Sequence, residues 1–103
     1  MIRRTVMMRL KPGALEEYKR RHDEIWPELV EEIRACGIKS MTTVVDGLTL
    51  VLFSEIESED AWDKLWHSDV HMRWGEVMNP LMAFRDDGIV DSNVLGEVFP
   101  LET

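Results

Sequence analysis

The order in which strand-like and helix-like periodicities follow one another constrains the fold of this chain more than any other feature. Residues 2–10 alternate as a strand does, and residues 14–36 place apolar side chains at helical spacing. Two short β-branched or apolar runs follow at 40–45 and 49–55. A second helical region comes next, and residues 94–101 return to strand character. The predicted order of elements is therefore βαββαβ.

Turn and cap residues divide this pattern further. Pro27 lies inside the first helical region, and proline pushes the preceding Trp26 out of the helical conformation, so two helices are expected there. Asp46-Gly47 is a strong hairpin signal between the two central strands. Ser58 and Ser68 are each followed by acidic residues and are expected to begin two separate helices.

The βαββαβ order is the ferredoxin-like pattern of the α+β class, with four antiparallel strands and helices over one face. Residues 1–103 are expected to form a single domain. A chain this short buries only about 60–65% of its unfolded surface, and one face of the sheet would be left open. We expect a homodimer in which two sheets pack face to face as a dimeric α/β barrel. A monomer with a polar outer face is the alternative.

Composition narrows the classes of partner. The chain has 20 Asp and Glu against 12 Lys and Arg, a net charge of −8, which argues against nucleic acid and against anionic lipid surfaces. No apolar run approaches the ~20 residues that cross a bilayer, and the N-terminus lacks the apolar segment of a signal peptide. Cys36 is alone and can form no intrachain disulfide. We expect a cytoplasmic protein with no membrane segment.

Three ring side chains form the densest group of candidate functional residues. Tyr18, His22 and Trp26 are spaced four residues apart and lie along one edge of the apolar stripe of the first helical region. One interpretation is that they only pack in the core. The other is a sugar pocket, in which aromatic faces meet sugar C–H groups, the phenol supplies a hydroxyl, and histidine exchanges protons near neutral pH.

The other two histidines, His67 and His71, could instead belong to a metal site. Asp63, His67 and His71 are also spaced by four, but Ser68-Asp69 is expected to begin a new helix between the histidines, so a shared face is not assured. The chain also shows no phosphate-binding glycine loop and no nucleophile elbow. We expect neither a metal nor a cofactor.

A resemblance to a known family covers nearly the whole chain. Residues 16–29 read EEYKRRHDEIWPEL and closely resemble the EEYxxRHxxIWPEL segment of L-rhamnose mutarotases. The similarity begins at the N-terminus and continues through residues 52–58, 68–74 and 97–99. It implies an isomerase of rhamnose metabolism that interconverts the α and β anomers of L-rhamnose or a related deoxy sugar.

The resemblance also implies site residues. The histidine matching His22 is the proton donor of that family, and the tyrosine matching Tyr18 binds the sugar. Further sugar contacts in the family come from a strand tyrosine, which aligns with Met41, and from a tryptophan pair, which aligns with Trp74-Gly75. Because two family aromatics are missing here, we expect the sugar specificity to differ.

The alternative is that the specificity for L-rhamnose is unchanged. In that case another aromatic residue takes the place of the missing ones in the pocket: Trp62, Trp66 or Phe84.

The implied reaction needs little machinery. Opening the hemiacetal ring takes an acid at the ring oxygen and a base at the anomeric hydroxyl, and no cofactor. Trp74 and Trp26 would stack on the sugar. The sequence does not identify the base, and leaves a carboxylate such as Asp69 or a water molecule as the candidates. Two alternatives remain: a cofactor-free or haem-binding oxidoreductase of the dimeric α/β barrel type, and a sugar-binding module without catalysis.

Overall fold

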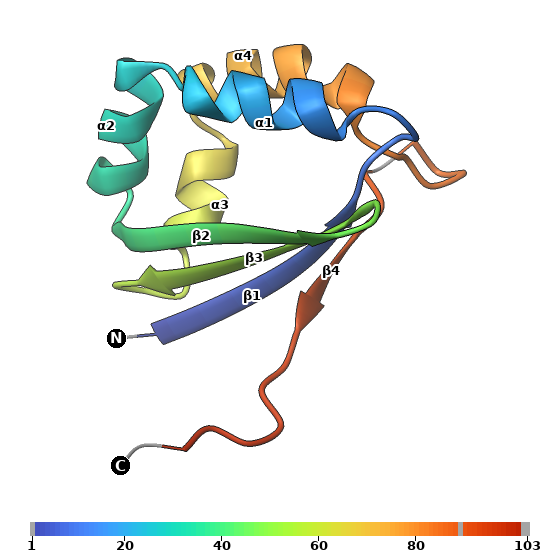
Figure 1. The fold of residues 1–103 in the computed structure, drawn as a ribbon. Helices are drawn as coiled ribbons and strands as arrows, with labels where there is room; N and C mark the ends of the chain where they lie inside the picture. The colour runs from blue at the N-terminus through green and yellow to red at the C-terminus, as the bar shows by residue number, and fades with distance from the viewer. Residues whose placement is uncertain (1, 89, 102–103) are drawn as a thin grey trace.

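The fold follows the predicted order of elements. The computed structural model describes residues 2–88 and 90–101. Its elements are β1 (Ile2–Arg9), α1 (Leu15–Asp23), α2 (Pro27–Ala35), β2 (Ile38–Asp46), β3 (Thr49–Ile56), α3 (Ala61–Trp66), α4 (Asp69–Met78), the 3-10 turn η1 (Asn79–Leu81) and β4 (Ser92–Leu95). The βαββαβ order is confirmed, with both helical regions split in two (Figure 1).

The strands form a four-stranded sheet in the order β2-β3-β1-β4 within the described residues. Each neighbouring pair is antiparallel. The helices lie on the same side of this sheet, which leaves its other face open (Figure 1). This arrangement confirms the predicted ferredoxin-like fold.

Local chemistry explains three of the boundaries. Trp26 is extended, at φ −65° and ψ 131°, and Pro27 is the first residue of α2, where its missing N–H costs no helical hydrogen bond. The Ser68 hydroxyl accepts a hydrogen bond from the backbone N–H of His71 and caps α4. Gly47 has φ 62° in the turn between β2 and β3, a conformation that glycine adopts without strain. The sequence predictions at these three points are confirmed.

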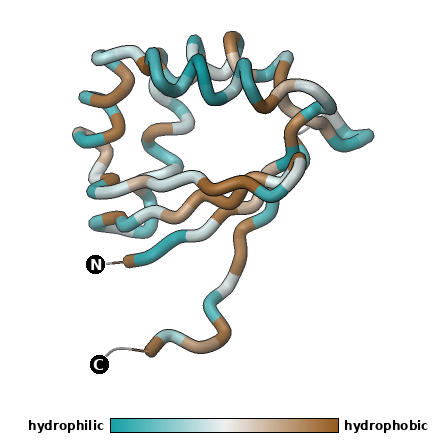
Figure 2. Tube along the Cα trace, in the orientation of Figure 1, coloured by the Kyte–Doolittle hydropathy of each residue, from teal (hydrophilic) through white to brown (hydrophobic). Residues whose placement is uncertain are grey.

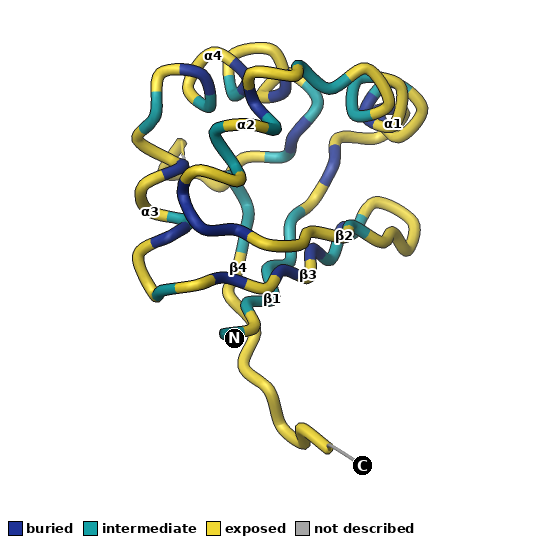
Figure 3. Tube along the Cα trace, turned by 90° about the vertical axis from the view of Figure 1, so that its left-hand side faces the viewer, coloured by how far each residue is buried: buried dark blue, intermediate teal, exposed yellow. Residues whose placement is uncertain are grey.

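The core lies between the sheet and the helices. Along β3 every second side chain is buried, ending with Ile56 at 0% exposure, and these side chains face the helical layer. The Trp62 indole donates to the Ser54 hydroxyl at 3.0 Å, which in turn donates to the Arg4 carbonyl at 3.1 Å. Figure 2 shows hydrophobic and hydrophilic residues alternating along the helices, and Figure 3 shows buried positions along β3. Among the residues that the structure describes, the one buried polar side chain on this sheet face, that of Ser54, is therefore hydrogen-bonded.

Two predicted boundaries were wrong. The last strand was expected at 94–101, but β4 pairs with β1 only over Ser92–Leu95. The residues that follow leave the strand on the side of the sheet opposite the helices (Figure 1), where Glu97 pairs with Arg3 of β1 at 2.8 Å and Val98 is 98% exposed. Ser58 was expected to begin a helix, but α3 begins at Ala61, and the Ser58 hydroxyl hydrogen-bonds to the Asp60 carboxylate instead.

The helices are short. The longest α-helix in the described part of the chain is α4, with 10 residues. In that same part, no helix is long and apolar enough to cross a membrane.

Candidate active site

A cavity of about 230 Å³ opens between the helical layer and the sheet. Its polar and aromatic lining comes from α1, α3, α4, η1 and β4: Tyr18, His22, Trp62, Trp66, His71, Trp74, Asn79 and Ser92. The rest of its lining is apolar: Val6, Met8, Ile25, Leu29, Ile33, Met41, Leu52, Leu65, Gly75, Met78, Met82 and Val90. The site is thus a largely apolar pocket with a few hydrogen-bonding groups, as small-molecule sites usually are.

His22 lies in the last turn of α1 with its ring oriented by its own helix. Its Nδ1 atom lies 3.0 Å from the Tyr18 carbonyl oxygen. A carbonyl oxygen only accepts, so Nδ1 carries a hydrogen and donates it. The ring is stacked at a tilt on Tyr18, with centroids 4.3 Å apart, and meets Trp74 edge-on at 5.4 Å. These contacts leave Nε2 as the nitrogen that can gain or lose a proton in the cavity.

Tyr18 is buried in α1 and lines the cavity. Burial raises the pKa of its phenol to about 12, and the Thr43 hydroxyl of β2, which hydrogen-bonds to the phenol, offsets part of that rise. The phenol is therefore protonated at neutral pH. It can donate a hydrogen bond to a ligand, but it cannot act as a base there.

The two tryptophans that the sequence placed in the site have different positions. Trp74 lines the cavity from α4, whereas Trp26 is not among the lining residues. The Trp26 ring packs edge-on against Trp74, with centroids 5.1 Å apart, and the Arg73 guanidinium lies 5.9 Å from its centroid. The structure brings Tyr18, His22 and Trp74 to the cavity and places Trp26 against Trp74.

The positions that depart from the family pattern also reach the cavity. Met41 lines it from β2 and Gly75 lines it from α4. A Cβ atom added at Gly75 would meet nothing within 4 Å, so the backbone there borders open space. Of the three residues expected to refill the wall, Trp62 and Trp66 line the cavity.

His71 lines the cavity, a position that its sequence spacing with Asp63 and His67 did not predict. It lies on the face of α4 that also carries Trp74, Gly75 and Met78, a helical i, i+3, i+4, i+7 spacing. Its ring packs on Trp66 with centroids 4.7 Å apart, and burial lowers its pKa. This spacing from Trp74 was the signal in the sequence that could have placed it in the site.

The grouping of His71 with Asp63 and His67 is not what the structure shows. His67 Nδ1 lies 3.6 Å from the Asp63 carboxylate in an exposed ion pair, whereas His71 lines the cavity. Within residues 2–88 and 90–101, no three histidine, cysteine or acidic side chains are placed to hold a metal ion.

The charge of the lining is as informative as its shape. Among the described residues that line the cavity there is no carboxylate, lysine or arginine, and the titratable side chains are Tyr18, His22 and His71. Such a lining suits an uncharged ligand with both hydroxyl groups and C–H faces. Two imidazoles in one pocket can donate and accept protons.

Comparisons with known proteins identify the family. A family model described as L-rhamnose mutarotase matches residues 3–101. The L-rhamnose mutarotase of Shigella flexneri serotype 5b is 39% identical over 103 residues, covering 98% of this chain and 99% of that protein. The crystal structure of an L-rhamnose mutarotase from Formosa agariphila is similar with a TM-score of 0.83 and 28% identity, covering 99% of this chain and 100% of that one.

A more distant likeness concerns the fold alone. The crystal structure of an antibiotic biosynthesis monooxygenase matches with a TM-score of 0.65 and 19% identity, covering 97% of this chain and 100% of that one. The family model and the 39% identical relative each span nearly the whole length of the sequence. This chain belongs to the L-rhamnose mutarotase family.

Proposed function

We propose that this chain is an isomerase that interconverts the α and β anomers of L-rhamnose in the cavity between α1, α3 and α4. The observation that carries the proposal is the placement of His22. Its Nδ1 is held by the Tyr18 carbonyl while its ring faces an uncharged, aromatic-lined cavity. Membership of the L-rhamnose mutarotase family supports the same reaction.

The reaction follows from these groups. Protonated His22 gives its Nε2 proton to the ring oxygen as the bond from C1 to that oxygen breaks, and a base takes the proton of the anomeric hydroxyl. Rotation about C1–C2 turns the other face of the aldehyde toward the C5 hydroxyl, and closure reverses the proton transfers. Tyr18 donates a hydrogen bond to a sugar hydroxyl, and the Trp74 ring packs on a C–H face.

Exchange NMR on L-rhamnose tests this proposal directly. Saturation of one anomeric proton should be transferred to the other anomer much faster with the protein than without it. Transfer at the buffer rate at saturating sugar would contradict the assignment. The remaining alternative would then be a protein that binds sugar without catalysis. Calorimetric titration with L-rhamnose would detect that binding.

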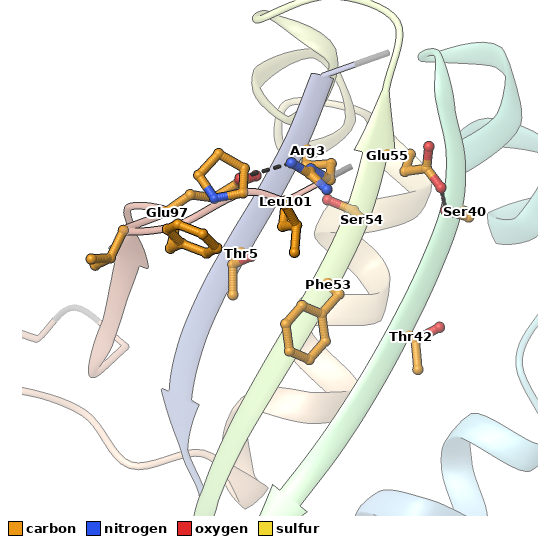
Figure 4. Close-up of a pocket in the computed structure, with 12 residues that line it drawn as sticks. Arg3, Thr5, Ser40, Thr42, Phe53, Ser54, Glu55, Glu97 and Leu101 are labelled. Atoms are coloured by element: carbon orange, nitrogen blue, oxygen red, sulfur yellow. Dashed lines mark hydrogen bonds and ion pairs between the residues drawn. The ribbon is translucent and has the colours of Figure 1, made fainter. Parts of the chain in front are cut away.

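We further propose that the chain works as a homodimer through the open face of its sheet. Val44 of β2 is 46% exposed, Phe53 of β3 is 48% exposed, and Leu95 of β4 is also exposed. The side chains of Thr5, Thr42 and Phe53 extend from neighbouring strands into one hollow of about 500 Å³, which the C-terminal segment borders (Figure 4). An open sheet face that exposes apolar side chains such as Val44, Phe53 and Leu95 in so short a chain is best covered by a second copy.

A further inference from the structure

The cavity holds a second imidazole that the reaction described above leaves without a role. Because its described lining contains no carboxylate, a base for the anomeric hydroxyl must come from Tyr18, His71 or water. Asp69, a carboxylate that the sequence offered for this task, is exposed and does not line the cavity. Tyr18 is protonated at neutral pH because burial raises its pKa to about 12.

His71 lies on a different wall from His22. His22 projects from α1, while His71 lies in the first turn of α4, one helical turn before Trp74. Trp74 meets the His22 ring edge-on, and Trp66 packs on the His71 ring. Aromatic side chains thus contact both imidazoles, and the α1 and α4 walls of the cavity each carry one histidine.

The charged groups near His71 are engaged elsewhere. On α4, Arg73 pairs with Glu28 of α2 at 3.4 Å. On α3, Asp63 pairs with His67, and Lys64 with Asp60. From α1 the titratable side chains that share the cavity with His71 are Tyr18 and His22.

From this arrangement we propose that His71 is the general base that pairs with His22 in anomer exchange. This inference rests on the proposed function. In ring opening, neutral His71 takes the proton from the anomeric oxygen, and the O–H electron pair becomes the second bond of the C1 aldehyde. The C1–O5 electron pair stays on the ring oxygen, which receives the proton of His22. On closure each proton returns to the atom from which it came, so no net charge or redox change occurs.

The protonation states support this division of roles. Burial disfavours the charged imidazolium and lowers the pKa of His71, so this ring is neutral and can accept a proton at neutral pH. The sign of the pH dependence follows. A base with a lowered pKa is active above that pKa, and exchange falls as the pH drops through it, below the ordinary histidine value of about 6.5.

The test is the pH profile of L-rhamnose exchange in the wild type and in four variants. His71→Gln and His71→Phe remove the base, and the phenylalanine keeps a ring against Trp66. His71→Ala opens space for added imidazole. His67→Gln is the matched control, because His67 is exposed and pairs with Asp63 outside the cavity.

We expect His71→Gln and His71→Phe to lose about 10²–10⁴-fold in exchange rate and to lack the acidic limb of the wild-type profile. Added imidazole should restore part of the rate of His71→Ala, and His67→Gln should match the wild type. A folded His71→Gln protein with the wild-type rate and acidic limb would overturn the inference while leaving the proposed function intact. Absence of wild-type exchange at any pH would contradict the proposed function itself.

A measurement on the unmodified protein covers the case in which the His71 variants fail to fold. The ring nitrogens of His71 can be followed by ¹⁵N NMR as the pH is varied. Binding of L-rhamnose should move the His71 titration, whereas His67 should titrate as it does without sugar. An unchanged His71 titration at saturating sugar would overturn the inference.

Discussion

The Nδ1 atom of His22 lies 3.0 Å from the carbonyl oxygen of Tyr18, one helical turn earlier in α1. This contact fixes which nitrogen of the ring carries a hydrogen in the neutral form, because the carbonyl can only accept. It also prevents the ring from flipping without loss of a hydrogen bond. One residue pair therefore sets both the tautomer and the direction in which His22 exchanges its proton.

Replacement of His22 should stop most of the catalysis. We expect His22→Ala to lower the rate of L-rhamnose exchange by about 10²–10⁴-fold, the usual contribution of a general acid. The fold should persist because this side chain is only partly buried. The rate is measured by saturation-transfer NMR and the fold by circular dichroism. His67→Ala is the control, and a folded His22→Ala protein with wild-type exchange would refute the assignment.

A charge on the open face of the sheet should separate the proposed dimer. Phe53 is 48% exposed at the centre of that face, between β1 and β2. We expect wild-type protein to sediment at about twice the 12.0 kDa chain mass and Phe53→Asp to sediment as a monomer, because a buried unpaired carboxylate is costly.

Phe84→Asp is the matched control for this experiment, because Phe84 is similarly exposed but does not lie on the sheet. It should remain dimeric. Wild-type protein that sediments as a monomer across a hundredfold dilution, with exchange activity retained, would rule out a dimer as the working form.

The charged side of α1 should contribute a pH-dependent part of the stability. Hydrogen bonds from Arg20 and then Arg21 lower the pKa of Glu17 to about 2, well below that of an unfolded glutamate. A carboxylate with a lowered folded pKa stabilises the fold above its unfolded pKa of about 4.3, and this stabilisation is lost as the pH falls toward 2. Glu17→Gln should therefore be less stable than wild type at pH 6, and the difference should shrink between pH 4 and 2.

Urea unfolding at each pH measures that difference, with Glu16→Gln as the neighbouring control. A gap between wild type and Glu17→Gln that stays constant from pH 6 to pH 2 would show that the charge of Glu17 is not its source.

Most of the fold could be predicted from residues that are neighbours in the sequence. The break at Trp26-Pro27, the Ser68 cap and the Asp46-Gly47 turn each depend on neighbouring residues, so they could be predicted without tertiary information. The end of β4 could not be predicted this way. Residues 94–101 are apolar enough for a strand, but strand pairing with β1 stops at Leu95, and Glu97 contacts β1 through an ion pair with Arg3 instead.

The site was predictable in part for the same reason. The spacing of Tyr18 and His22 lies within one helix, so the sequence could place both on one face. His71 and Trp66 reach the cavity only because α3 and α4 pack over the same sheet face as α1. In the sequence His71 is four residues from His67 and could be grouped with it, whereas the helix boundary at Ser68 directs the two side chains apart.

The last prediction concerns which sugars the cavity accepts. Gly75 borders open space, since a Cβ atom there would meet nothing within 4 Å, and Met41 offers no hydroxyl at the position that the sequence resemblance aligns with a family tyrosine. We therefore expect the wild type to tolerate a C5 substituent bulkier than the methyl group of L-rhamnose. L-mannose, which carries a hydroxymethyl group there, should be exchanged within about tenfold of L-rhamnose, because one extra group in a roomy pocket costs little.

Gly75→Trp should fill that space and raise the preference for L-rhamnose over L-mannose by about 10–200-fold in kcat/KM, and Met41→Tyr should add a directional partner for a sugar hydroxyl. Gly75→Ala is the control, because it adds only the Cβ atom and should leave the preference unchanged. Exchange rates over a panel of L- and D-aldoses measure all three variants and the double variant. The contradicting result is a wild type that already rejects L-mannose, with a preference that neither large substitution changes. In that case Trp62 and Trp66, which line the same cavity, take the place of the missing family aromatics, and the space at Gly75 does not set specificity.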